Sequence, residues 1–225
     1  MPEPLVLLHG FGGTHRAWDA VRAQLPPQRY RPVVAPDLPG HGVRGAQRPV
    51  DWAACVDAVL ADAPSGRFVL CGYSLGGRVA QHVAVAAPER VARLVLVSSS
   101  PGLADGATRA AADDALAAEI ETMTAAQFAD RWQAQAIFAA TAAGALGPWR
   151  EDLLRNEPRN LAAALRGLTV GRMRTFGEDF AMPVTRIVGE RDARYRELAG
   201  PDAVLIPGAG HGLPREAPAA LAAAI

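Results

Sequence analysis

A serine stands between two glycines where an apolar run meets a helical pattern. The stretch FVLCGYSLGGRVA, residues 68–80, holds Gly72, Ser74 and Gly76 in the spacing G-x-S-x-G. Small flanking residues permit a tight turn from strand to helix, which strains the serine backbone and exposes its hydroxyl. The amide dipoles of the following helix favour negative charge developing beside that hydroxyl. Ser74 is therefore the predicted reactive group.

A serine hydroxyl needs a histidine base and a carboxylate that orients the base, in the chain order serine, acid, histidine. GERD places Asp192 just after one apolar run, and GAGH places His211 just after the next. Glu190 is the competing acid. Among the five histidines, only His211 follows Ser74 at a predicted strand end. We predict a triad of Ser74, His211 and Asp192.

Negative charge on a substrate oxygen requires donors already in place. The backbone N–H of Leu75, directly after the serine, is one predicted donor, and the N–H of Phe11 in LLHGFGG is the other. We interpret His9 in this loop as structural. The loop DLPGHG, residues 37–42, is predicted to lie at the same sheet edge as scaffold.

Composition narrows the classes of ligand. The 225 residues have a formal net charge of zero, so nothing favours nucleic acid or an anionic membrane surface as a partner. A small molecule, a carboxylate or an ester, is the expected substrate of a monomer or homodimer. The two cysteines and five histidines form no metal-binding spacing, and we expect neither a metal nor an organic cofactor. Without a recognisable signal peptide, the protein is expected in the cytoplasm.

Short apolar runs alternate with helical segments along most of the chain, which predicts an α/β fold with a mostly parallel sheet flanked by helices. Residues 103–176 break this alternation because they have an alanine-rich helical pattern and no strand. We predict that they form an all-helical cap over the carboxyl edge of the sheet, where ligands bind in such folds. The predicted core is thus residues 1–102 and 177–225, although ordinary covering helices are the alternative for the insertion.

Taken together, HGFGG, DLPGHG, GYSLGGRVA, GERD and GAGH resemble the α/β-hydrolase superfamily over nearly the whole chain. Within it the chain is most similar to the 2-succinyl-6-hydroxy-2,4-cyclohexadiene-1-carboxylate synthases of menaquinone biosynthesis. This resemblance rests on GYSLGGRVA, on SSPGL after the next predicted strand, and on FADRWQAQAIF, LRNEPRNLAAALRGLTVG and GERDARY further on.

The resemblance implies a lyase. The serine, activated by the histidine, would remove a proton next to a carbonyl, and pyruvate would leave without an acyl-enzyme. The oxyanion donors would then hold an enolate-like oxygen. The substrate-binding residues implied by the resemblance are Tyr73, Arg78, Trp132, Phe138 and Arg155, the last holding a carboxylate with Arg159 as an equal candidate. The two aromatic residues in the cap could instead be core, and Arg155 could be a solvated helix residue.

The chain also departs from that family. Where the family's first cap helix carries a substrate-binding arginine, this sequence has Ala112, Asp113 and Asp114, and Arg109 is the nearest basic residue. An aspartate there is expected to repel a substrate carboxylate. The segment GLPRE after His211 differs from the family's more polar pattern as well.

Other activities use the same residues. A carboxylic ester hydrolase would form an acyl-enzyme on Ser74, and a carbon–carbon bond hydrolase would use serine-assisted proton chemistry. A binding module without activity is disfavoured because the whole triad and the oxyanion loop are present.

Overall fold

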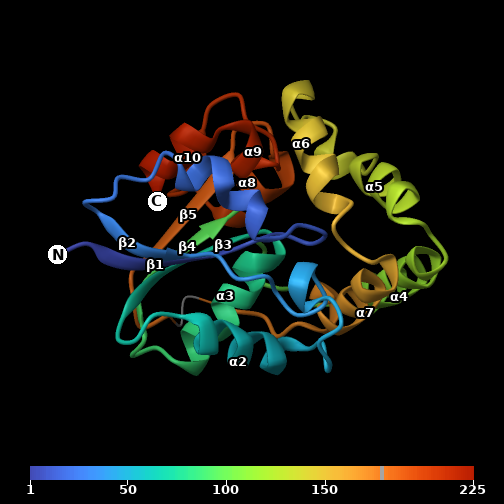
Figure 1. Cartoon of the computed structure of the whole chain (residues 1–225), viewed down its shortest axis with the longest axis horizontal. Helices are drawn as coiled ribbons and strands as arrows, with labels where there is room; N and C mark the ends of the chain where they lie inside the picture. Colours follow the sequence, from blue (N-terminus) through green and yellow to red (C-terminus); the bar gives the residue numbers. More distant parts are fainter. Residues whose placement is uncertain (178–179) are drawn as a thin grey trace.

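The computed structural model describes residues 1–177 and 180–225. Six strands form one sheet in the order β2-β1-β3-β4-β5-β6, and each pair of neighbours is parallel (Figure 1). The strands are β1 (Glu3–Leu8), β2 (Tyr30–Val34), β3 (Phe68–Tyr73), β4 (Val91–Val97), β5 (Val184–Gly189) and β6 (Val204–Ile206).

Helices cover both faces of the sheet because its strands are apolar on both sides. Leu5 and Leu7 of β1 pack into one buried cluster, whereas Val6 and Leu8 pack into another, as the alternation of side chains along a strand requires. The first face is covered by η1 (His15–Trp18), α1 (Asp19–Arg22), α9 (Leu213–Glu216) and α10 (Pro218–Ala224). The second is covered by α2 (Trp52–Asp62) and α3 (Leu75–Ala86). The remaining core elements are η2 (Gly42–Arg44) and α8 (Ala193–Ala199).

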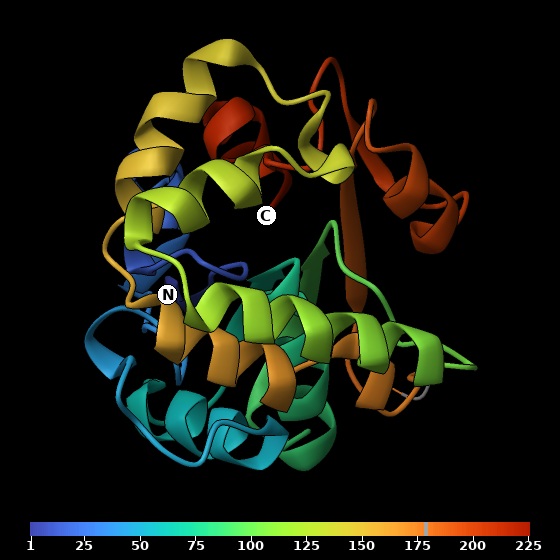
Figure 2. The ribbon, with the colours of Figure 1, turned by 90° about the vertical axis from the view of Figure 1, so that its right-hand side faces the viewer.

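Every element between β4 and β5 is helical in the part of the chain that the structure describes. These elements are α4 (Ala107–Glu121), α5 (Ala125–Gln133), η3 (Ala136–Phe138), α6 (Ala143–Leu153), α7 (Pro158–Gly167) and η4 (Val170–Arg172). They share their own hydrophobic cluster, in which Ile120, Phe128, Leu153 and Leu161 are fully buried. Figure 2 shows α4 beside α7 and α5 beside α6, and Figure 1 places all four beyond one end of the sheet. The cap boundaries at residues 103 and 176 stay a prediction.

The sheet topology brings distant segments to one edge. The chain passes from β1 outward to β2 and then returns to β3 on the other side of β1, so the order reverses between β1 and β3. In parallel sheets such a reversal opens a crevice at the carboxyl ends of the two strands. Ser74 follows β3 there, and Asp192 and His211 follow β5 and β6 at the same edge.

The predicted α/β fold with a parallel sheet and a helical cap is confirmed. Among the described residues no helix is both long and apolar enough to span a membrane.

Candidate active site

Ser74 occupies the turn between β3 and α3 with a backbone conformation that is rare for residues with a side chain. Its φ is 52° and its ψ is −111°. Strain of this kind, of order 1–3 kcal/mol, persists only where neighbouring groups fix the backbone. Here the N–H of Ser74 donates to the carbonyl of Val97 at 2.9 Å, and the Ser99 hydroxyl donates to the carbonyl of Ser74 at 3.0 Å.

The two glycines flanking this turn have no room for a side chain. A Cβ on Gly72 would lie 2.3 Å from the carbonyl oxygen of Gly76. A Cβ on Gly76 would lie 2.2 Å from the carbonyl oxygen of Leu8, at the end of the neighbouring strand β1. The G-x-S-x-G spacing is thus required by the close approach of α3 to the ends of β1 and β3.

A hydrogen-bonded chain connects the three predicted triad residues. His211 Nε2 lies 3.2 Å from Ser74 Oγ, and His211 Nδ1 lies 2.7 Å from Asp192 Oδ2. With the Nδ1 proton donated to the carboxylate, Nε2 is left to accept the serine proton. Glu190, the competing acid, instead accepts a hydrogen bond from the N–H of Gly208 at 2.8 Å. The geometry therefore favours Asp192 as the partner of His211.

The loop after β1 lies directly against Ser74. A Cβ on Gly10 would lie 2.7 Å from the Tyr73 ring and 3.5 Å from Ser74 Cβ. The N–H groups of Phe11 and Leu75 donate no hydrogen bond within the described residues, so both are available to an oxyanion. Their catalytic role stays a prediction.

His9 has a structural position in the same loop. It is fully buried, donates from Nδ1 to the carbonyl of Gly10 at 2.8 Å, and accepts at Nε2 from the N–H of Leu38 at 3.0 Å. Burial lowers its pKa and keeps the ring neutral. His9 thereby ties the loop after β1 to the segment 37–42, which acts as scaffold.

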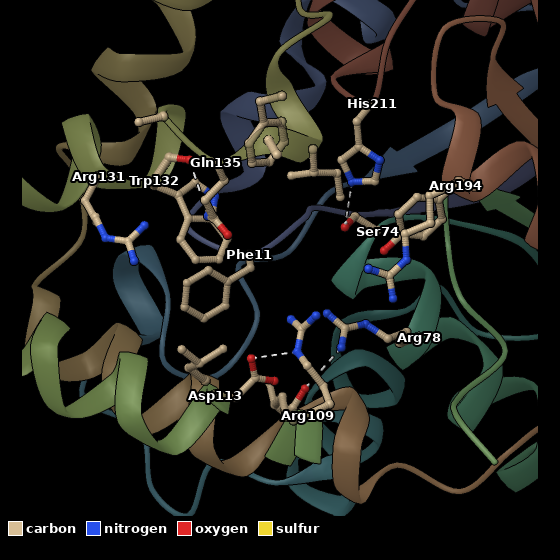
Figure 3. Close-up of a pocket in the computed structure, with 17 residues that line it drawn as sticks. Phe11, Ser74, Arg78, Arg109, Asp113, Arg131, Trp132, Gln135, Arg194 and His211 are labelled. Atoms are coloured by element: carbon tan, nitrogen blue, oxygen red, sulfur yellow. Dashed lines mark hydrogen bonds and ion pairs between the residues drawn. The ribbon is translucent and has the colours of Figure 1, made fainter. Parts of the chain in front are cut away.

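A cavity of about 460 Å³ opens beside Ser74 and His211, between the sheet edge and the cap (Figure 3). One wall is aromatic. The Trp132 ring lies 4.5 Å from that of Phe11, and the Phe138 ring lies 5.5 Å from that of His211, measured between centroids. Both cap aromatics belong to the cap cluster and also line the cavity. Each is therefore part of the cap core and of the cavity wall at once, and its contact with a substrate stays a prediction.

Four arginines and one carboxylate line the same cavity: Arg78, Arg109, Arg131, Arg194 and Asp113. Arg78, on α3, is partly buried, and its one hydrogen bond is a long one of 3.4 Å from Nη1 to the carbonyl of Leu168. No carboxylate of the described residues lies within ion-pair distance of it. Burial lowers the pKa of Arg78, which expresses the cost of an uncompensated charge.

The two aspartates expected to repel a substrate differ in position. Asp113 lines the cavity, but it accepts a hydrogen bond from Arg109 Nε at 2.8 Å and one from the Thr169 hydroxyl at 2.6 Å. Its charge is therefore compensated within the wall. Asp114 points away and pairs with Arg172 on the surface. Arg109 lines the cavity from the same helix, with its charge paired to Asp113.

The other predicted substrate contacts, Arg155 with its alternative Arg159 and Tyr73, do not line this cavity. Arg155 follows the end of α6, where its exposed side chain lines a separate depression beside Arg16 and Arg215. Arg159 is also exposed and does not line the cavity. Tyr73 is buried beneath the site, its ring 5.5 Å from that of His211, because alternation along β3 turns it into the core. Tyr73 does not line the cavity of about 460 Å³, but it lines a small pocket of about 30 Å³ together with Phe11 and Ser74, and its contact with a substrate stays a prediction.

Sequence reasoning missed several residues of the wall, among them Gln135, Arg131, Arg194 and Tyr195. Arg131 precedes Trp132 on α5, and Arg194 and Tyr195 lie in the first turn of α8, just after Asp192. The Tyr195 ring lies 4.6 Å from that of His211. A signal for the last two existed in the sequence, since residues directly after a triad member at a strand end must lie near the site.

Residues 5–224 match the alpha/beta hydrolase family. The chain belongs to this family. It is similar to the 2-succinyl-6-hydroxy-2,4-cyclohexadiene-1-carboxylate synthase of Klebsiella pneumoniae strain 342, at 34% identity over 98% of this chain and 91% of that protein. Its fold matches MenH from S. aureus with a TM-score of 0.88 and 26% identity, covering 98% and 91% of the two chains.

A shorter stretch of this alpha/beta hydrolase resembles a protein with another activity. Over 100 residues it is 45% identical to the pimeloyl-[acyl-carrier protein] methyl ester esterase of Vibrio campbellii, which covers 44% of this chain and 38% of that one. The predicted similarity to the synthases is confirmed, since it extends over nearly the whole chain.

Proposed function

We propose that this alpha/beta hydrolase is a lyase of the 2-succinyl-6-hydroxy-2,4-cyclohexadiene-1-carboxylate synthase type. Ser74 passes its hydroxyl proton to Nε2 of His211 as it takes a proton from the carbon next to a substrate carbonyl. The electron pair of that C–H bond forms an enolate, and its collapse breaks the carbon–oxygen bond to the leaving group. The leaving oxygen departs with the electron pair of the broken bond as the enolate of pyruvate, which takes up the proton held by His211 and restores the neutral base. Asp192 orients His211 and stabilises its protonated form.

The observation that carries this proposal is the charge of the cavity beside Ser74. Of the four arginines that line it, Arg109 pairs with Asp113 and Arg131 with Glu119. The partly buried Arg78 lacks an ionic partner within the described residues. Buried charges that stay unpaired are destabilising, so the cavity fits a ligand that brings its own negative charges. A substrate with more than one carboxylate does so, and planar guanidinium groups bind carboxylates in bidentate fashion.

The backbone donors suit the same reaction. The N–H groups of Phe11 and Leu75 would hold the enolate oxygen, and removal of one such donor typically costs about 3–4 kcal/mol of transition-state stabilisation. Gly10 allows the loop carrying Phe11 to approach Ser74 closely.

The test is pyruvate release from the succinyl-cyclohexene precursor, measured for the wild type, Arg78→Gln and Arg159→Gln. Arg159 is the matched control because it is exposed and lies outside the cavity. We expect Arg78→Gln to lower kcat/KM by about 100-fold, as loss of a buried charge-assisted contact does. The control should retain wild-type values. Absence of pyruvate release from the folded wild type would refute the proposal.

The partial match to a methyl ester esterase favours one second candidate, hydrolysis of a carboxylic ester through an acyl-enzyme on Ser74. Turnover of p-nitrophenyl acetate and butyrate, followed in parallel, separates the two. Ester turnover without pyruvate release would support the esterase, with the arginines then holding a carboxylate remote from the ester.

A further inference from the structure

One carboxylate holds the loop that carries His211. Glu216 Oε2 accepts the N–H of Gly210 at 2.9 Å, and Glu216 Oε1 accepts the N–H of Gly212 at 2.8 Å. The two amides flank His211 on either side. Because β6 ends at Ile206 and α9 begins at Leu213, these bonds fix the loop between regular elements.

The glycines on both sides of His211 allow this arrangement. A Cβ on Gly212 would lie 2.9 Å from Glu216 Oε1, and one on Gly210 would lie 3.3 Å from it. Charge-assisted hydrogen bonds from backbone N–H groups to a carboxylate are stronger than neutral ones. Glu216, in the segment GHGLPRE, therefore holds the two amides that flank the histidine of the same segment.

The same segment contacts the cap. Glu216 Oε2 also lies 3.4 Å from the N–H of Ala142, at the start of α6. Arg215 pairs with Asp152 of α6, and the side chains of both are largely buried. Asp152 in turn accepts hydrogen bonds from the N–H of Thr14 at 3.1 Å and from its hydroxyl. Two adjacent residues after His211 thus connect it with cap helix α6 and, through Asp152, with the loop that carries Phe11.

We propose that Glu216 is a positioning residue for His211, and that the Arg215–Asp152 ion pair couples this position to the docking of α6. With the clamp in place, Nε2 of His211 stays within reach of Ser74 Oγ and Nδ1 stays on Asp192. Without it, the histidine loop has no other side-chain hydrogen bond to the amides next to His211 in the residues that the structure describes. The inference rests on the proposed use of His211 as a base.

The decisive experiment compares Glu216→Gln, Glu216→Ala and the control Glu151→Gln, which changes an exposed carboxylate on α6. A glutamine retains one acceptor oxygen and an alanine none, so kcat should fall about 10-fold and then about 100-fold, roughly one power of ten per lost charge-assisted bond. KM should change less than threefold, and the control should behave as the wild type.

A spectroscopic readout is independent of substrate. The proton NMR resonance of His211 Nδ1–H, bonded to Asp192, should be sharp in the wild type and in Glu151→Gln, and broadened or lost in Glu216→Ala. If Glu216→Ala does not fold, Gly212→Ala provides the second variant, because its Cβ would displace Oε1 while leaving every charge in place. Asp152→Asn should weaken the same resonance to a smaller extent.

The outcomes separate this inference from the proposed function. An unchanged resonance and unchanged kcat in folded Glu216→Ala would overturn the positioning role, even if pyruvate release is found in the wild type. A lost resonance in a protein that releases no pyruvate would support the positioning role and refute the lyase. Equal effects of Glu216→Gln and Glu151→Gln would also overturn the inference.

Discussion

The reactive edge and the cavity wall of this alpha/beta hydrolase differ in whether their polar side chains already have hydrogen-bond partners. At the reactive edge, defined here as Ser74, Asp192 and His211, the side chains already bond to one another. In the cavity wall, by contrast, the guanidinium of Arg78 and the buried indole N–H of Trp132 lack strong partners within the described part of the chain. The reactive edge is thus complete without a ligand, whereas the wall has charge and hydrogen-bonding capacity left for one.

The two regions also come from different parts of the chain. The reactive edge is fixed by short loops after β3, β5 and β6, so its geometry follows from the sheet. Most of the wall comes from the cap, whose helices share a separate hydrophobic cluster. A change in the cap can therefore alter the cavity wall while the geometry of the reactive edge stays the same.

The largest expected effect comes from breaking the reactive edge. Ser74→Ala should reduce kcat by about 10⁴-fold or more, because the serine and its histidine act as a unit. Its melting temperature should stay within a few degrees of the wild type, since the hydroxyl makes no contact that supports the fold. Steady-state kinetics with thermal melts followed by circular dichroism check this, and a variant that unfolds would mean that the serine is structural.

A change at Gly76, which lets α3 approach the strands below the reactive edge, should lower the free energy of unfolding. Gly76→Ala should lower the free energy of unfolding by at least about 3 kcal/mol, because a Cβ 2.2 Å from the Leu8 carbonyl forces α3 off the sheet. Gly144→Ala on α6 is the matched control: it has open space around it and should gain about 0.5–1 kcal/mol. Urea unfolding measures both, and equal stability of the two variants would contradict the packing argument.

A substitution in the cavity wall should affect the binding of an anionic substrate. Arg109→Gln should raise KM for an anionic substrate about tenfold with little change in kcat, as loss of about 1.4 kcal/mol of charge-assisted binding does. Arg172→Gln removes a cation that pairs with Asp114 outside the cavity, and it should leave KM unaltered. If both variants raise KM equally, the effect is the general field of the protein and not a contact in the wall.

A last prediction concerns His41, which packs against Phe11 in the loop after β1. Burial lowers the pKa of His41 from its ordinary value of 6.5 to about 3, so the folded protein keeps it neutral while the unfolded chain binds a proton below pH 6.5. Stability should therefore fall as the pH falls from 6.5 towards 3, by up to about 1.4 kcal/mol per pH unit for one such group. His41→Leu should flatten this slope in urea unfolding between pH 7 and 4. A slope as steep as that of the wild type would contradict the assignment.

The sequence by itself determined the reactive residues and the fold class. Ser74 could be predicted because its turn needs glycines at fixed distances along the chain, and Asp192 and His211 because each follows an apolar strand. Such signals are local, since strand ends and tight turns depend on neighbouring residues and the parallel topology then brings those ends together.

Only the tertiary structure decided which arginines line the cavity. Arg155 looked suitable in the sequence but lies outside the cavity, whereas Arg131 and Arg194 line it. The direction of a helical side chain depends on how its helix packs, which in this cap is set by contacts between residues far apart along the chain. For the same reason Glu216 has a visible role only once the fold brings its carboxylate to both amides beside His211.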